Sequence, residues 1–107
     1  MQHITATELA HWIQDSSRVP PVLLDVRETQ EHDICQIPGS TLMPMRSVLE
    51  QLSELNPEAA IVCVCHHGMR SRQVAVFLEE NGFTRVMNLT GGIHAWSQSV
   101  DLTMPIY

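Results

Sequence analysis

The sequence predicts an α/β fold in which an open, mostly parallel sheet carries helices on both faces. Short apolar runs that suit buried strands alternate along the chain with stretches whose apolar residues recur at helical spacing. The connections between these segments are short, and strand–helix–strand units of this kind build parallel sheets. A chain of 107 residues is long enough for one core, so residues 1–107 are expected to form a single domain.

The first half of the chain contains three expected strands and two expected helices. A brief strand at residues 3–4 leads into a helix from Thr5 to about Gln14, which begins with a capping-box pattern. After a Pro-Pro pair, the β-branched run Val22–Val26 suits a buried strand. We expect a short helix over Thr29–Cys35 and, after a Pro-Gly turn, a further strand over Ser40–Met43.

The second half repeats the alternation. A second capping-box pattern and apolar residues at helical spacing predict a helix over Ser47–Leu55. The apolar run Ala60–Val64 is expected to be the central strand, and a helix over Ser71–Asn81 follows it. Arg85–Leu89 is expected to be the last strand, after which Gly91 and Gly92 lead into a short final helix.

The bulk composition excludes several classes of partner. Hydrophobic residues make up 44% of the chain and charged residues 17%, which is ordinary for a soluble globular protein. Twelve acidic residues against six basic ones give a net charge of −6, which argues against direct binding of nucleic acid. We find no apolar run long enough to cross a membrane and no export signal, and the three cysteines suit a reducing compartment. The expected location is therefore cytoplasmic.

One loop stands out because a cysteine lies between a buried strand and a helix N-terminus. Backbone N–H groups in a tight loop, together with the positive end of the helix dipole, favour thiolate over thiol and can hold an anion. We therefore interpret Cys65 as a nucleophile. The expected binding loop around it consists of His66, His67, Gly68, Met69, Arg70 and Ser71.

Three residues of this loop have expected structural tasks. Gly68 is expected where the backbone needs a positive φ or approaches the sulfur closely. Arg70 has two plausible roles, since it can contact an incoming anion or pair with Asp25 or Glu28 to brace the loop, and we favour the bracing role slightly. Ser71 is expected to cap the following helix.

Asp25, at the C-terminal end of the strand Val22–Val26, and Arg27 and Glu28, directly after it, are expected to support the loop. For Asp25 a general acid or base role is open, but an ion pair with Arg70 or a turn cap is the favoured interpretation. Arg27 and Glu28 are interpreted as a loop-bracing or solvated pair. Cys63 is expected to be a small core residue rather than a redox partner of Cys65.

The order of several motifs resembles the rhodanese-like sulfurtransferases. The spacing Cys-x-x-Gly-x-Arg-Ser is similar to the family's active-site loop. Leu23–Glu28 resembles its first strand and turn, Ile37–Ser40 its following turn, and Gly82–Trp96 its closing segment. Together these motifs run in the family's order from about Ile4 to Trp96.

The resemblance implies a rhodanese-like fold and a thiosulfate sulfurtransferase that works through a persulfide on Cys65. It implies a small sulfur-containing anion as donor, a thiophilic acceptor such as cyanide, a thiol or a sulfur-relay protein, and neither cofactor nor metal. His66, His67 and Met69 stand where many thiosulfate-using relatives carry a fixed positive charge. Affinity for thiosulfate is therefore expected to be modest, and the donor is then another protein's persulfide.

Two other functions compete with sulfur transfer. A phosphatase or arsenate reductase on the same fold has one more residue between cysteine and arginine, which widens the loop for a tetrahedral oxyanion. The four residues between Cys65 and Arg70 favour sulfur. A non-catalytic rhodanese-like module that only binds a partner is the other alternative, and the presence of Cys65 argues against it.

Overall fold

A computed structural model describes residues 1–107. Its five strands form one parallel sheet with the order β1-β5-β4-β2-β3, so the predicted fold class is confirmed. The strands are β1 (Gln2–Ile4), β2 (Val22–Asp25), β3 (Thr41–Leu42), β4 (Ile61–Val64) and β5 (Val86–Leu89). The helices are α1 (Ala6–Gln14), α2 (Thr29–Ile34), α3 (Met69–Glu80) and α4 (Gly92–Ser99). Two 3-10 helices, η1 (Met45–Ser47) and η2 (Leu52–Glu54), lie between β3 and β4.

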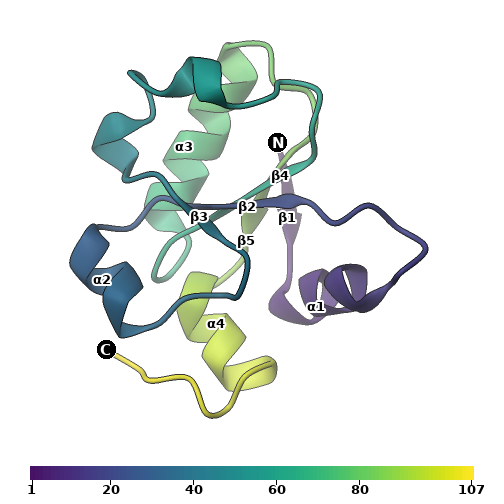
Figure 1. Cartoon of the computed structure of the whole chain (residues 1–107), viewed down its shortest axis with the longest axis vertical. Helices are drawn as coiled ribbons and strands as arrows, with labels where there is room; N and C mark the ends of the chain where they lie inside the picture. Colours follow the sequence, from purple (N-terminus) through teal and green to yellow (C-terminus); the bar gives the residue numbers. More distant parts are fainter.

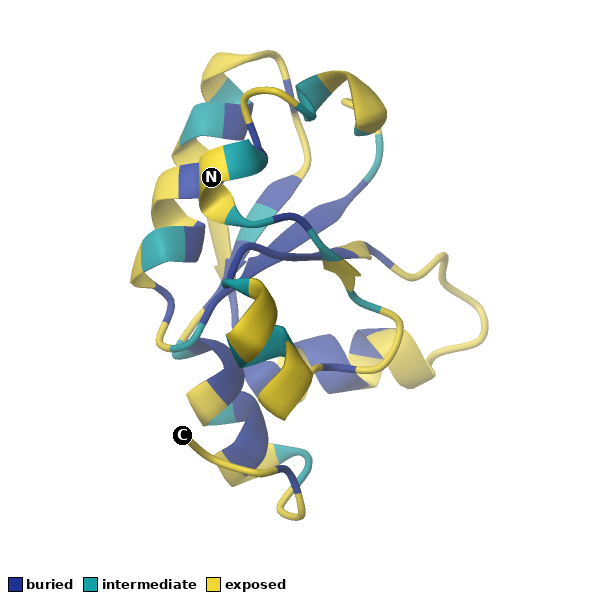
Figure 2. Cartoon of the chain, turned by 60° about the vertical axis from the view of Figure 1, so that its left-hand side comes forward, coloured by how far each residue is buried: buried dark blue, intermediate teal, exposed yellow.

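The sheet separates two hydrophobic clusters, as expected for an open parallel sheet covered on both faces. One face packs against α1 and α4, and α3 covers the other together with the segment that contains η1 (Figure 1). Neighbouring residues of β4 point to opposite faces, so Val62 belongs to the first cluster and Cys63 to the second. The buried colour of Figure 2 follows the strands and the inner sides of these helices.

The central position of β4 decides where the polar residues gather. Because all strands are parallel, their carboxyl ends lie at one edge, which is where ligands bind in such sheets. β4 ends directly before Cys65, β2 ends at Asp25, and β5 ends directly before Thr90 and the Gly91–Gly92 turn. The topology therefore brings the three predicted loop regions to the same edge of the sheet.

The predicted helix over Ser47–Leu55 is wrong. The segment forms η1 and η2 with turns between them, although Val48, Leu52 and Leu55 all pack against the cluster beneath α3. Val48 is buried, whereas Leu49 is 69% exposed. Short 3-10 turns therefore suffice to place three of the four apolar side chains against the core, and no continuous helix is needed for these contacts.

None of the helices has the length and apolar character that crossing a lipid bilayer requires.

Candidate active site

Cys65 lies where β4 passes into α3. The residue is 1% exposed and belongs to the cluster beneath α3. The chain turns sharply between the two elements because Gly68, the N-cap of α3, has a φ of +102°. This left-handed conformation is the one expected for Gly68, and it costs a glycine little.

Two groups contact the Cys65 sulfur directly. The Gly68 amide nitrogen lies 3.1 Å from Sγ and donates a hydrogen bond to it. The Ser71 hydroxyl oxygen lies 3.2 Å from Sγ, within hydrogen-bond reach of sulfur. Both contacts are buried, where a hydrogen bond is electrostatically stronger than in water.

The loop also carries unused donors. Five further amide groups of the loop have no acceptor in the protein, namely those of His66, His67, Met69, Arg70 and Ser71. The first amides of a helix lack partners within the helix, and such groups bind anions readily. The loop therefore combines a buried sulfur with a set of free N–H donors.

The N-terminus of α4 is hydrogen-bonded to the start of the Cys65 loop. The Ile93 amide donates to the Cys65 carbonyl at 2.8 Å, and the His94 amide donates to the His66 carbonyl at 3.0 Å. Gly92 makes this approach possible, since a Cβ on it would collide with the Cys65 carbonyl oxygen and lie 2.6 Å from that of His66. The second glycine of the Gly91–Gly92 turn is thus required for the helix to approach the loop closely.

Ser71 does not cap α3 as predicted. The helix begins two residues earlier, at Met69, and Gly68 takes the capping position because only glycine adopts its backbone conformation easily. Ser71 is instead fully buried in the first turn. Its hydroxyl donates to the Asn88 side-chain oxygen at 2.5 Å as well as lying against Cys65.

Asn88 on β5 is a site residue that the sequence analysis missed. Its side-chain nitrogen donates to the Gly68 carbonyl at 3.1 Å while its oxygen accepts from Ser71. One buried amide therefore contacts both residues that touch the sulfur. An asparagine inside an otherwise apolar strand was the available signal, because a buried amide needs partners of its own.

Arg70 pairs with Glu31, so the predicted partners Asp25 and Glu28 are both wrong. The guanidinium nitrogens lie 2.7 and 2.9 Å from the two Glu31 carboxylate oxygens. Glu31 points toward α3 from the first turn of α2, a placement that depends on how α2 packs and not on local sequence. The Arg70 hydrogen bonds lower the pKa of Glu31 to about 2.

Asp25 pairs with Arg27 at 2.7 Å, and both side chains are fully buried. Arg27 is therefore not a solvated residue, as one interpretation had it. Burial alone lowers the pKa of Arg27, but the hydrogen bonds with Asp25 and Tyr107 reverse that effect and hold it above its ordinary value. Arg27 also donates to the Cys35 carbonyl at 2.6 Å, so it ties β2 to the segment after α2.

Glu28 does not pair with Arg27. Its carboxylate forms an exposed ion pair with Arg46 on η1. The pair therefore joins the start of α2 to the segment before β4, away from the Cys65 sulfur.

The tip of the loop is more exposed than its base. Met69 is 77% exposed, whereas the His66 ring stacks on Tyr107 with 4.0 Å between ring centroids. Burial and the neighbouring His67 lower the pKa of His66, so its ring is neutral near pH 7. The tip therefore lacks a fixed positive charge of its own.

Cys63 lies in the core beneath α3. Burial and the neighbouring Cys65 raise the pKa of Cys63 to about 12, so it remains a thiol at neutral pH. Its side chain is fully buried. This placement agrees with its interpretation as a core residue.

Comparison with known families decides the classification. The sequence model of the rhodanese-like domain family matches residues 5–99 of this chain. The chain belongs to the rhodanese-like domain family. The resemblance inferred from the sequence motifs is confirmed.

Solved rhodanese-like structures share the whole fold. The chain is similar to a rhodanese-like domain protein from Staphylococcus aureus, at 34% identity and a TM-score of 0.85, and the match covers 100% of this chain and 99% of that one. The four helices and the five-stranded parallel sheet described above are thus a rhodanese-like fold.

Curated relatives are longer proteins. The chain is 43% identical over 89 residues to the rhodanese-like/PpiC domain-containing protein 12, chloroplastic, of Arabidopsis thaliana, covering 79% of this chain and 30% of that protein. It is 32% identical over 119 residues to the adenylyltransferase and sulfurtransferase MOCS3 of Culex quinquefasciatus, covering 99% of this chain and 27% of that protein. The chain therefore spans less than a third of the length of either relative.

Proposed function

We propose that this rhodanese-like domain is a sulfurtransferase that carries a sulfane sulfur as a persulfide on Cys65. The observation that supports the proposal most strongly is the surroundings of the sulfur. Cys65 Sγ lies within 3.2 Å of the Gly68 amide and the Ser71 hydroxyl, and five further loop amides have no acceptor. Fixed dipoles of this kind stabilise negative charge with little reorganisation.

The first half-reaction loads the sulfur. The Cys65 thiolate attacks the outer sulfur of thiosulfate or of a donor persulfide, forms a new S–S bond and breaks the old one. The bonding electrons of the broken bond leave with sulfite or with the donor thiolate. The loop amides that have no acceptor in the protein, such as those of His66, Met69 and Arg70, supply N–H donors for the charge on the outer sulfur.

The second half-reaction delivers the sulfur. A thiophilic acceptor, either cyanide, a thiol or a sulfur-relay partner protein, attacks the outer sulfur and releases Cys65 as a thiolate. Arg70 supports the loop in both steps through its pair with Glu31, and Asp25 and Arg27 hold the adjacent loop. None of these three side chains needs to transfer a proton.

The neutral tip of the loop bears on the identity of the donor. His66 is uncharged near pH 7 and Met69 is exposed, so the loop's N–H groups carry most of the attraction for a small dianion. We therefore infer modest use of thiosulfate and better use of a protein persulfide, whose carrier contacts the exposed tip.

The two competing functions give different results in a steady-state test. Sulfur transfer predicts double-displacement kinetics for thiosulfate and cyanide, with parallel lines in reciprocal plots and no thiocyanate from the Cys65→Ser variant. A partner-binding module would give no turnover with any sulfane donor. A phosphatase would hydrolyse p-nitrophenyl phosphate and leave thiosulfate unused.

A further inference from the structure

A groove runs beside the Cys65 loop, between α3 and the edge strand β1. Its volume is about 540 Å³, within the usual range for small-ligand sites. Cys65 itself does not line it, and neither half-reaction described above uses Arg72, His3 or Thr90. The lining of the groove includes His3, His67, Arg72, Asn88 and Thr90.

The charge of this lining is unlike that of the whole chain. The chain has twelve acidic residues and six basic ones, yet no carboxylate lines the groove. Arg72 contributes a fixed positive charge, and His3 and His67 add two imidazole rings. The groove is therefore an acid-free basic region on an acidic protein, and it is complementary to an anion.

Arg72 is free to bind such an anion. Arg27, Arg46 and Arg70 form ion pairs, and Arg18 lies over the Trp12 ring. Arg72 makes no ion pair and no side-chain hydrogen bond within the protein. A guanidinium with all of its donors free suits a carboxylate, which it can hold with two parallel hydrogen bonds.

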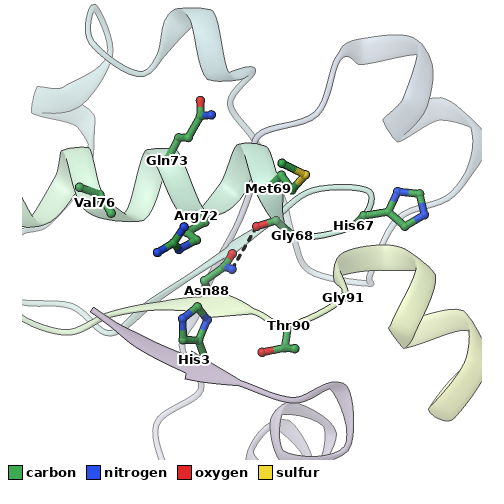
Figure 3. A pocket seen from close by; sticks show the side chains of 10 residues that line it. All are labelled: His3, His67, Gly68, Met69, Arg72, Gln73, Val76, Asn88, Thr90 and Gly91. Atoms are coloured by element: carbon green, nitrogen blue, oxygen red, sulfur yellow. Dashed lines mark hydrogen bonds between the residues drawn. The ribbon is translucent and has the colours of Figure 1, made fainter.

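Several separate elements bring polar groups to this groove. Arg72 comes from α3 and His3 from β1, and Figure 3 shows both side chains beside Asn88 of β5. The two strands are paired so that His3 lies opposite Asn88. Thr90 adds a hydroxyl from the end of β5. The convergence depends on the sheet, so it is not a chance feature of one exposed helix.

The groove reaches the reactive loop at one end. Gly68 and Asn88 line the groove, and the same two residues bond to Cys65 and Ser71 respectively. His67 and Met69, at the tip of the loop, line the same end. A small ligand held by Arg72 therefore lies next to the loop that holds the sulfur.

We propose that this groove is an anion subsite that holds the carboxylate of a small acceptor thiol. The proposed role rests on the proposed function, whereas binding of the carboxylate does not. In the transfer step the acceptor thiolate attacks the outer sulfur of the Cys65 persulfide. A bond forms between the two sulfurs, the persulfide bond breaks, and its electron pair stays on Cys65, so the products are an acceptor persulfide and the free thiolate.

Binding is tested with succinate as the probe in the Cys65→Ser protein, by titration followed in two-dimensional NMR. The amides of His3, Thr90 and Gly91 are expected to shift and to saturate. Arg72→Gln is expected to weaken binding about fivefold, as for an exposed charge pair. Arg85→Gln, at an exposed arginine outside the groove, is the matched control and is expected to change nothing. Equal affinity in the Arg72→Gln protein, or shifts confined to other surfaces, would overturn the subsite.

The role in transfer is tested on protein loaded with sulfur. Discharge rates with 3-mercaptopropionate and its neutral amide are compared at equal thiolate concentration, and the ratio of the two rates is expected to fall about fivefold in Arg72→Gln but not in Arg85→Gln. An unchanged ratio contradicts the assigned role. If the protein never takes up sulfur, the proposed function fails, while the succinate titration still decides whether the subsite exists.

Discussion

Glu31 on α2 accepts hydrogen bonds from two guanidinium nitrogens of Arg70 on α3, at 2.7 and 2.9 Å. A bidentate pair of this kind fixes the orientation of the arginine as well as its position. The pair joins Arg70 in the first turn of α3 to α2, a helix that has no buried residue. The position of α2 is thereby linked to the shape of the Cys65 loop.

Replacing Glu31 by glutamine should weaken this link. We expect Glu31→Gln to lower the free energy of unfolding by about 1 kcal/mol, since Arg70 is partly exposed and such pairs are worth little in water. The rate of sulfur transfer should also fall, by more than the small loss of stability explains, because Arg70 loses its fixed orientation. Urea unfolding and steady-state kinetics measure the two effects, with Asp33→Asn on the same helix as the control. Unchanged turnover would contradict the bracing role.

The same pair gives stability a pH dependence. The pKa of Glu31 is lowered from 4.5 to about 2 in the folded protein, so the unfolded chain binds its proton more readily. The contribution of the pair is therefore complete above pH 4.5 and is lost as the pH falls toward 2. Urea unfolding between these limits should show a shallower acid decline for Glu31→Gln than for the native protein. Parallel curves for the two proteins would exclude the pair as a source of the acid sensitivity.

Ser71 should control the reactivity of Cys65. Ser71→Ala removes the hydroxyl that lies 3.2 Å from Sγ. The hydroxyl has one hydrogen, which turns from Asn88 to the sulfur when Cys65 is ionised, and loss of a hydrogen bond to a charged group is worth about 1.5 kcal/mol or more. Alkylation of Cys65 by iodoacetamide at pH 7 should slow about tenfold, with peptide mapping to assign the label. Ser97→Ala, which removes a buried hydroxyl bound to the His94 carbonyl, is the control and should leave the rate unchanged. Equal rates in the Ser71→Ala and native proteins would exclude a contact with the thiolate.

Two glycines with positive φ allow backbone strain to be separated from damage to the loop. Gly92→Ala and Gly82→Ala both place a side chain in the left-handed region, at a cost of about 1 kcal/mol each. Only Gly92 lies against the Cys65 and His66 carbonyls, while nothing lies within 4 Å of a Cβ at Gly82. We expect both variants to lose stability in urea but only Gly92→Ala to lose most of its sulfur transfer. Equal activity losses would mean that α4 does not hold the loop.

The sequence predicted the parts of this protein that depend on local patterns. Apolar runs located β2, β4 and β5, and the glycine in the loop located the positive φ at Gly68. It was less successful where tertiary packing decides the outcome. The segment around Leu49 has helical spacing, but short 3-10 turns already place Val48, Leu52 and Leu55 against the core, so no continuous helix forms.

The candidate site divides in the same way. Cys65 and the order of its neighbours can be read from the chain, but the partners of Arg70 and Ser71 cannot. Glu31 and Asn88 lie 39 and 17 residues away from them in sequence, on elements whose relative placement only the folded sheet determines. In the sequence, Glu31 is visible only as an acidic residue in the first turn of a helix, and Asn88 only as an amide inside an apolar strand. Each of them has several possible partners.

The central claim is that Cys65 carries the transferred sulfur. Its most direct measurement is the intact mass of the protein after incubation with thiosulfate, or with a protein persulfide, followed by removal of the donor. The native protein should gain about 32 Da, one sulfur, which cyanide removes, and Cys65→Ser should gain nothing while Cys63→Ser gains the same mass as the native protein. No gain with either donor, or an equal gain in Cys65→Ser, would contradict the claim.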